Sequence, residues 1–227
     1  MTVTNEAPTL APDHTGRAAR VREATATQHR STETRSFITD LMGGKLSLAA
    51  YTAYLAQFAY VYRALESRNP APADPHLITD TRLHRMAAIE ADLAALGAPD
   101  WEDAHPALPA TQAYVERLLA VAHDVPRYLA HHYTRYLGDL SGGQAIAALV
   151  ERHYGATPEQ LGFYRFEGID TPVRFKRAYR EALDALELNA TADAAFIEEA
   201  CAAFTYNGAI FDELLDVTDA AAPAARA

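Results

Sequence analysis

The chain has 227 residues, 49% of them hydrophobic, so it can form one large domain or two small ones with a buried core. Its formal net charge of −10 argues against nucleic acid as a partner. Its single cysteine, Cys201, excludes an internal disulfide and favours a reducing, cytoplasmic location.

The first half of the chain begins with a tail and continues in helices. Residues 1–16 lack a hydrophobic signal region and contain acidic residues and prolines, which predicts a disordered tail. A helix is expected from Arg17 to the low thirties, and a short one from Phe37 to Met42 ends at Gly43-Gly44. Further helices are expected after the capping residue Ser47 and over Thr81–Leu96, with Pro-rich connections over 69–75 and 99–109.

The second half also has helical signals, and no alternating strand pattern occurs anywhere in the sequence. A helix is expected from Thr111 to about 123, and Asp124-Val125-Pro126 then starts a long helix that ends at Gly155. After a loop, helices are expected from Thr171-Pro172 and from the capping residue Thr191 to about 217. We therefore predict one all-α domain over 17–217, with a flexible tail over 218–227.

The long helix contains the most informative stretch, residues 133–144, which read YTRYLGDLSGGQ. A glycine inside a helix costs roughly 1 kcal/mol relative to alanine. The spacing places Gly138 and Gly142 on one face, with Asp139 and Gly143 beside it. Such a stripe lets a helix kink and lets its backbone approach something flat.

His29 has neighbours that suit a metal ligand. Arg22 precedes it by two turns on nearly the same face, and Glu33 follows by one turn. A carboxylate there can accept a proton from the second ring nitrogen, as is usual for a ligating histidine. The spacing alone fits an ordinary solvated helix face equally well.

Two further patterns are also open to two interpretations. Lys176 and Arg180 lie one turn apart and suit an anion with two carboxylates, or they are simply two cations at helical spacing. Phe204, Asn207 and Phe211 form a stripe that fits either a core or a cofactor wall. Taken together, the four patterns describe a flat, iron-bearing, dicarboxylate ligand, which is haem.

At this point the sequence resembles the haem oxygenase family, over about residues 17–217. LAHHYTRYLGDLSGGQ at 129–144 is similar to the distal-helix signature of that family, and REATATQHRSTE at 22–33 to its proximal-helix segment. The likeness continues in FKRAYR at 175–180 and EEACAAFTYN at 198–207. The resemblance implies a helical bundle in which haem lies between a proximal helix and a kinked distal helix.

The resemblance also implies roles for particular residues. His29 would ligate the iron with Glu33 near it, and Asp139 would organise distal water. The backbone of Gly138, Gly142 and Gly143 would cover the distal face. The propionates and the distal wall would involve the remaining residues: Arg22, Tyr133, Lys176 and Arg180 for the propionates, and Phe204 and Asn207 for the wall and its hydrogen bonds. Arginine at 22 departs from the lysine common in the family but keeps the charge.

The implied reaction converts haem b, which is both cofactor and substrate, to biliverdin, ferrous iron and CO, using O2 and external electrons. A helix face without side chains leaves bound oxygen close to the ring edge, and Asp139 can supply protons through ordered water. The sequence has no flavin or nicotinamide fingerprint, so a separate ferredoxin or reductase is expected to supply the electrons. No apolar run is long enough to span a membrane, so a cytoplasmic protein is expected. A monomer is the default expectation.

Two other classes of protein remain open. A haem carrier or sensor would keep His29 and the cations but would not need Asp139 or the glycines. A helical relative with different chemistry is the second: a di-iron carboxylate protein needs two Glu-x-x-His pairs, and only Glu102 to His105 has that spacing. An enzyme of thiamin metabolism would need a nucleophilic cysteine, for which Cys201 is a weak candidate.

Overall fold

The structure is a computed structural model that describes residues 16–221. These residues form helices joined by short connections, and no strand occurs among them, which confirms the all-α prediction. Ten α-helices occur in this order: α1 (Arg17–Ala24), α2 (Ala26–Glu33), α3 (Ser36–Met42), α4 (Leu48–Glu66), α5 (Met86–Ala95), α6 (Trp101–Ala104), α7 (Pro109–Val121), α8 (Val125–Tyr154), α9 (Pro172–Asp184) and α10 (Ala190–Ala221). Short 3-10 turns are η1 (His76–Ile78), η2 (Thr81–Leu83), η3 (Pro158–Gln160) and η4 (Gly162–Tyr164).

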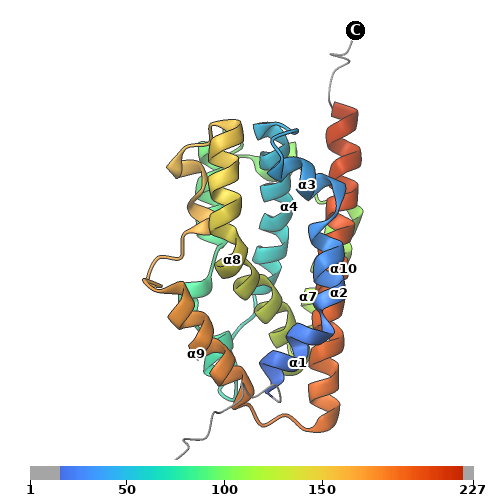
Figure 1. Cartoon of the computed structure of the whole chain (residues 1–227), viewed down its shortest axis with the longest axis vertical. Coiled ribbons are helices and arrows are strands. Elements are labelled where there is room, and N and C mark those ends of the chain that lie inside the picture. The colour runs from blue at the N-terminus through green and yellow to red at the C-terminus, as the bar shows by residue number, and fades with distance from the viewer. Residues whose placement is uncertain (1–15, 222–227) are drawn as a thin grey trace, which may run out of the picture.

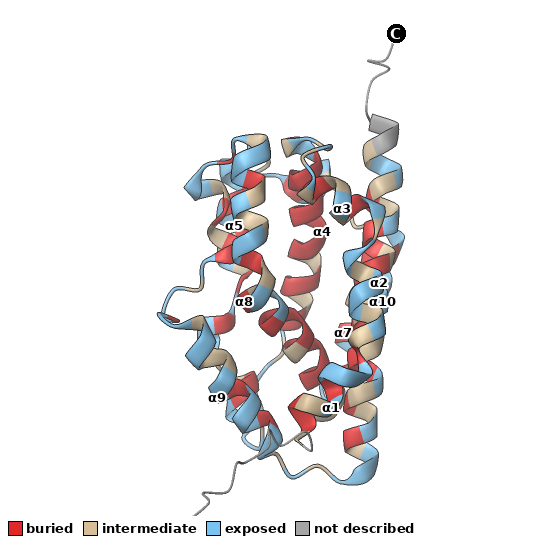
Figure 2. Cartoon of the chain, in the orientation of Figure 1, coloured by how far each residue is buried: buried red, intermediate tan, exposed pale blue. Residues whose placement is uncertain are grey.

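Helix α10 is the common support of the bundle. It runs along one side of the molecule and packs against α8, α2, α7, α3, α1 and α4 (Figure 1). Helix α4 packs against α5, α7 and α8, and most of its residues are buried (Figure 2). Because both α2 and α8 pack on α10, the position of one relative to the other is set through this third helix.

Helix α8 is continuous from Val125 to Tyr154, yet its first and last parts run in different directions (Figure 1). Its start is capped as predicted, since the Asp124 carboxylate accepts a hydrogen bond from the backbone N–H of Arg127. It ends at Gly155, which has a φ of 67°. Glycine adopts this left-handed conformation without steric cost, so the stop follows directly from the sequence.

Several predicted helix boundaries differ from the structure because partners distant in sequence decide them. The first helix is interrupted at Thr25, whose hydroxyl bonds to the carbonyl of Val21, and such bonds bend helices. The expected helix over Thr81–Leu96 is instead a 3-10 turn followed by α5. At the start of α5, the backbone N–H groups of Arg85 and Met86 donate to the carboxylate of Glu66 on α4, which caps the helix.

The starts of α7 and α10 also differ from the predictions. Helix α7 begins at Pro109, ahead of the predicted Thr111, and Glu213 of α10 accepts from its second residue. Helix α10 begins at Ala190, ahead of the predicted Thr191, and its cap is the Asn189 side chain, which accepts from the backbone of Ala192. It continues to Ala221, beyond the predicted end near 217. The predicted tails over 1–16 and 218–227 lie mostly outside the described residues.

A buried ion network joins α7, α8 and α10. Glu199 accepts a hydrogen bond of 2.8 Å from Nε of Arg117 and lies 2.9 Å from Nε2 of His131. Burial opposes the ionisation of Glu199, but these two hydrogen bonds outweigh it and lower its pKa to about 2. The carboxylate is therefore charged at neutral pH and holds the three helices together.

Candidate functional site

His29 lies half-exposed near the middle of α2, where two side chains fix its ring. Its Nδ1 is 3.2 Å from Oε2 of Glu33, one turn further along the helix. The ring of Phe204 on α10 meets it edge to face, with 5.3 Å between the ring centroids. These contacts leave Nε2 without a hydrogen-bonding partner among the described residues, so this nitrogen is able to ligate a metal.

The glycines of α8 divide into two kinds. A Cβ atom placed on Gly138 or Gly142 would meet no atom within 4 Å, so both look onto open space. A Cβ atom on the buried Gly143 would lie 2.9 Å from Cδ1 of Tyr164. Gly138 and Gly142 therefore leave a helix surface without side chains, whereas Gly143 permits close packing of α8 against η4.

Asp139 is held in a network of polar side chains from three helices. The hydroxyl of Tyr62 on α4 donates to its Oδ2, and Nη2 of Arg135 lies 3.4 Å from its Oδ1. Arg135 also donates to the Tyr62 hydroxyl at 3.1 Å and to Oδ1 of the buried Asn207 on α10 at 3.1 Å. The guanidinium sits 4.5 Å over the ring of Phe58, which completes its surroundings.

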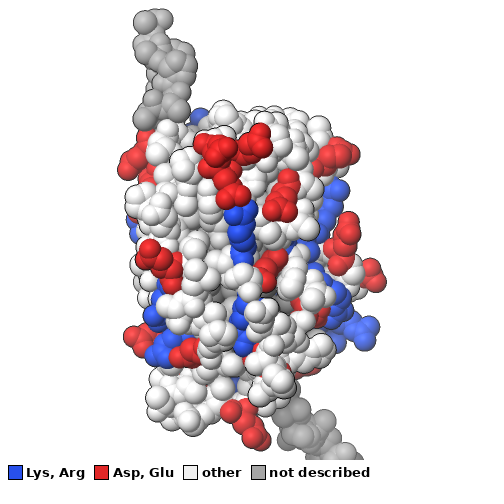
Figure 3. Space-filling model, turned by 180° about the vertical axis from the view of Figure 1, so that it is seen from behind, with Lys and Arg blue, Asp and Glu red and all other residues white. Residues whose placement is uncertain are grey.

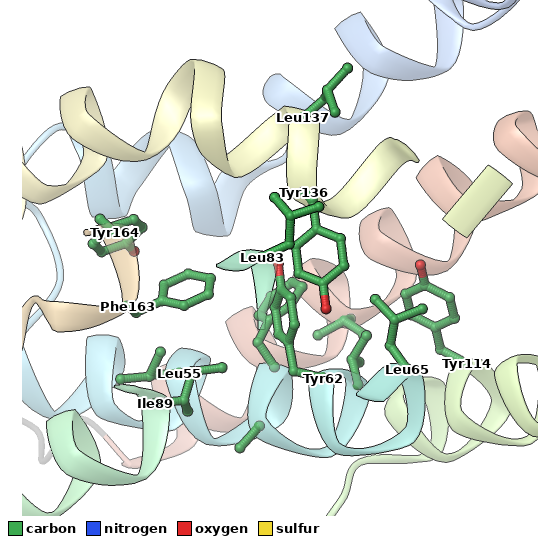
Figure 4. Close-up of a cluster of buried hydrophobic side chains, with 14 of the residues drawn as sticks. Leu55, Tyr62, Leu65, Leu83, Ile89, Tyr114, Tyr136, Leu137, Phe163 and Tyr164 are labelled. Atoms are coloured by element: carbon green, nitrogen blue, oxygen red, sulfur yellow. The ribbon is translucent and has the colours of Figure 1, made fainter. Parts of the chain in front are cut away.

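The protonation of this network is set mainly by burial. Burial raises the pKa of Asp139, although the charge of Arg135 and the hydrogen bond from Tyr62 favour the carboxylate. Burial also raises the pKa of Tyr62 well above its ordinary value, so its hydroxyl stays protonated and can only donate to Asp139 or accept from Arg135. The Tyr62 ring is fixed by Tyr136 and Phe163, whose centroids lie 5.8 and 5.4 Å away (Figure 4).

The predicted propionate-binding residues come from α1, α8 and α9. Arg180 and Arg22 both act on Tyr133: their charges favour its phenolate, but burial dominates and raises the pKa of Tyr133. Lys176 donates from Nζ to the Ser141 hydroxyl on α8 at 3.0 Å. Among the described residues, no carboxylate oxygen lies within 4.0 Å of the charged nitrogens of these three cations. The cations are therefore able to bind an anion at the edge of α8.

Two of the predicted site residues, Phe204 and Asn207, lie about one turn apart on α10 and contact different parts of the site. Phe204 contacts His29, and Asn207, about one turn along α10, contacts Arg135 and through it the Asp139 network. The placement of Phe204 differs from the expectation of a distal wall, because its ring packs on the histidine side. Phe211 instead packs in the core against Phe37, Tyr54 and Phe58.

Tyr62 and Arg135 belong to the site but were not predicted from the sequence. Arg135 had a usable signal, because it precedes Asp139 by four residues and so shares its helix face. Tyr62 had none, because it lies on a different helix and formed part of an apolar stripe.

Among the described residues, none of the helices is both long enough and apolar enough to cross a membrane.

Comparisons with known proteins show the family and the fold. The family model described as "Heme oxygenase" matches residues 16–213. Heme oxygenase 1 of Rattus norvegicus is 37% identical over 203 residues, which are 86% of this chain and 70% of that protein. Two solved structures are also similar. Heme oxygenase-1 of the cyanobacterium Synechocystis, in complex with heme, is 30% identical with a TM-score of 0.84, covering 91% of this chain and 95% of that one. Heme oxygenase of Leptospira interrogans is 33% identical with a TM-score of 0.82, covering 87% and 99%.

Proposed function

The chain belongs to the haem oxygenase family and is a haem-degrading, biliverdin-producing enzyme, and we propose that it holds its substrate between α2 and α8. His29 would ligate the iron from the α2 side, with the carboxylate of Glu33 beside its Nδ1 at 3.2 Å. The backbone at Gly138 and Gly142 covers the other face of the ring. The proposal rests chiefly on the open space over these two glycines, beside a carboxylate that is held in place.

The cations and Tyr133 set the orientation of the substrate in this arrangement. Arg22, Lys176 and Arg180 pair with the two propionates, which supply the carboxylates that these cations lack among the described residues. Burial against α8, followed by the charge of Arg180, lowers the pKa of Lys176. The positive charges of Lys176 and Arg180 repel each other. An anion bound beside Lys176 offsets this repulsion, so binding of the substrate is favourable at this edge.

Asp139 handles protons on the glycine side. Bound haem would supply both the iron that activates O2 and the ring that is oxidised, while the protein supplies position and protons. Tyr62 and Arg135 fix the carboxylate of Asp139, and Asn207 fixes Arg135. Asp139 in turn holds a water molecule that passes protons toward the substrate. The absence of side chains at Gly138 and Gly142 keeps bulky acids away from the oxygen and directs it to the ring edge.

The reaction also needs O2 and electrons, and we propose that a separate ferredoxin or reductase supplies the electrons. Helix α9 carries four cations, Arg174, Lys176, Arg177 and Arg180, against two acidic residues, Glu181 and Asp184. On the molecule seen from behind, acidic and basic side chains are interspersed (Figure 3). An acidic donor would be attracted to α9, close to the propionates. We further propose that the protein acts as a cytoplasmic monomer.

A haem carrier that does not degrade its ligand is the alternative to test. Purified protein should be loaded with haem and given ascorbate, or a ferredoxin and its reductase, in air. An active enzyme loses the Soret band and forms biliverdin, whereas a carrier keeps the band.

His29→Ala should retain part of its haem binding, lose the histidine-ligated spectrum and turn over far more slowly, with partial recovery in imidazole. A variant with the parental spectrum and rate would remove His29 from the site.

A further inference from the structure

Helix α9 carries two of the proposed propionate-binding cations and lies at the edge of the bundle, against α1 and α8 (Figure 1). Its last residue is tied to α1, because the backbone N–H of Ala18 donates to Oδ1 of Asp184 at 2.7 Å. Near its start, Phe175 lies 5.2 Å from the guanidinium of Arg82, whose side chain is largely exposed. Lys176 is eight residues from Asp184, which is roughly 12 Å along the helix. The tie to α1 is therefore too distant to fix this lysine by itself.

A buried pair of side chains holds the middle of α9 against α8. The Tyr179 hydroxyl lies 2.8 Å from Nδ1 of His132. The two rings are nearly parallel, with 13° between their planes and 5.9 Å between their centroids. Both residues are almost completely buried, at 3% exposed for His132 and 4% for Tyr179. Burial, followed by the charge of His84, lowers the pKa of His132 to about 3, so its neutral imidazole can pair with the phenol in either tautomer.

His132 is itself fixed by two tyrosines of α8, Tyr128 one turn before it and Tyr136 one turn after it. The ring of Tyr136 meets the imidazole edge to face, with 4.6 Å between the centroids. The Tyr128 hydroxyl donates to the carbonyl of Leu65 on α4 at 2.8 Å. The Tyr136 hydroxyl donates to Oε1 of Glu66, also on α4, at 3.0 Å. The position of α9 is therefore set from α4, through a stack of buried rings.

Tyr179 lies beside the cations that α9 presents to the substrate. Lys176 precedes it by three residues and Arg180 follows it directly, so the three side chains leave the helix on adjoining lines. The ring of Tyr133, another of the proposed propionate-binding residues, is 6.4 Å from the ring of Tyr179. A shift of α9 along α8 would thus move both cations relative to Tyr133 and to the haem edge.

We propose that His132 is a positioning residue that fixes α9 through Tyr179 and so determines which edge of the haem ring is opened. The inference rests on the proposed function, in which the cations of α9 pair with the propionates. Without this hydrogen bond α9 turns about its tie to α1, and Lys176 moves further than Arg180 because it is more distant from that tie. The haem ring then rotates in its own plane, and the proportions of the biliverdin isomers change.

The test removes one buried hydroxyl at a time. Tyr179→Phe deletes the bond to His132 and keeps the ring. Tyr128→Phe is the matched control, because it deletes a similarly buried hydroxyl of the same stack that bonds to α4 instead of α9. The double variant His132→Leu with Tyr179→Phe removes both partners, so neither is left unpaired. The measurements are the melting temperature and amide hydrogen exchange of α9 in the apo protein, the haem orientation by NMR of the cyanide complex, and the biliverdin isomers.

Both single variants should melt a few degrees below the parent, because each loses a buried hydrogen bond. Only Tyr179→Phe should also show faster exchange in α9 and more than one haem orientation. In this variant, a biliverdin isomer that is minor or absent in the parent should rise to about a tenth of the product or more. The double variant should recover part of the lost stability and keep the altered isomers, which separates positioning from stability.

Parental isomers or parental exchange in Tyr179→Phe would overturn the positioning role of His132. The same isomer change in Tyr128→Phe would also overturn it, because any loosening of the stack would then suffice. So would a return to the parental isomers in the double variant. A parent that forms no biliverdin would instead refute the proposed function, and hydrogen exchange in the apo variants would still decide whether His132 holds α9.

Discussion

Alanine substitutions at the three glycines of α8 separate protein stability from substrate binding. Gly138 and Gly142 lie inside the helix, and an added Cβ atom would meet nothing within 4 Å. Replacing glycine by alanine in a helix interior gains about 0.5–1 kcal/mol. For a protein of this size, 1 kcal/mol raises the melting temperature by roughly 2–4 °C. Each of the variants Gly138→Ala and Gly142→Ala should therefore melt about 1–4 °C higher than the parent in the apo form.

The same methyl groups should weaken haem binding. In the proposed complex they occupy space that the ring needs, and overpacking by a small group costs about 1–3 kcal/mol. This free energy corresponds to roughly a 5- to 150-fold loss of affinity. The expected result is a more stable protein that binds its substrate less well and converts less of it to biliverdin.

Gly143→Ala is the internal control, because it makes the same chemical change on the other face of the helix. Its Cβ atom would lie 2.9 Å from Cδ1 of the buried Tyr164, closer than such atoms normally approach. The overpacking cost of about 1–3 kcal/mol exceeds the gain in helix propensity, so this variant should melt at a lower temperature.

The assay combines thermal unfolding of the three apo variants with haem titration followed by absorbance and with the yield of biliverdin per haem. Parental haem affinity and biliverdin yield in Gly138→Ala and Gly142→Ala would refute the placement of haem against these glycines. Stabilisation of Gly143→Ala equal to that of the other two would show that Tyr164 does not restrict this position.

Three further predictions concern charged residues. Replacing Arg22, Lys176 and Arg180 together by alanine should lower haem affinity and give mixed biliverdin isomers, because the ring is then free to rotate; unchanged affinity with one unchanged isomer would exclude them. Asp139→Ala should still bind haem but degrade it with little biliverdin, and Asp139→Asn should behave likewise, as judged by product spectra; parental biliverdin rates in both would reduce Asp139 to a structural residue. The pKa of Glu199 is depressed to about 2 in the folded protein. The free energy that its carboxylate contributes to folding is therefore fully present when the pH is above the ordinary pKa of a glutamate, and it is lost as the pH falls toward 2. Glu199→Gln should therefore cost on the order of 3 kcal/mol at pH 7 and much less near pH 2, as measured by urea unfolding.

The sequence alone determined the features that depend on near neighbours in the chain. Asp124 and Gly155 predict the two ends of α8 because a capping carboxylate and a left-handed glycine act within a single turn. The all-α class follows in the same way from helical periodicity without strand signals. The pattern of Gly138, Asp139 and Gly142 indicated a flat ligand, and with three further stretches of sequence it indicated the family.

Only the tertiary structure decided the features that join distant parts of the chain. Glu66 caps α5 from another helix, and Phe204 meets His29 because α10 packs against α2. Tyr62 reaches Asp139 across 77 positions of sequence. A cap or a periodic stripe is local and can be recognised in a short window of sequence. The partner of a buried polar group is chosen by how the helices pack, so no spacing in the chain specifies it.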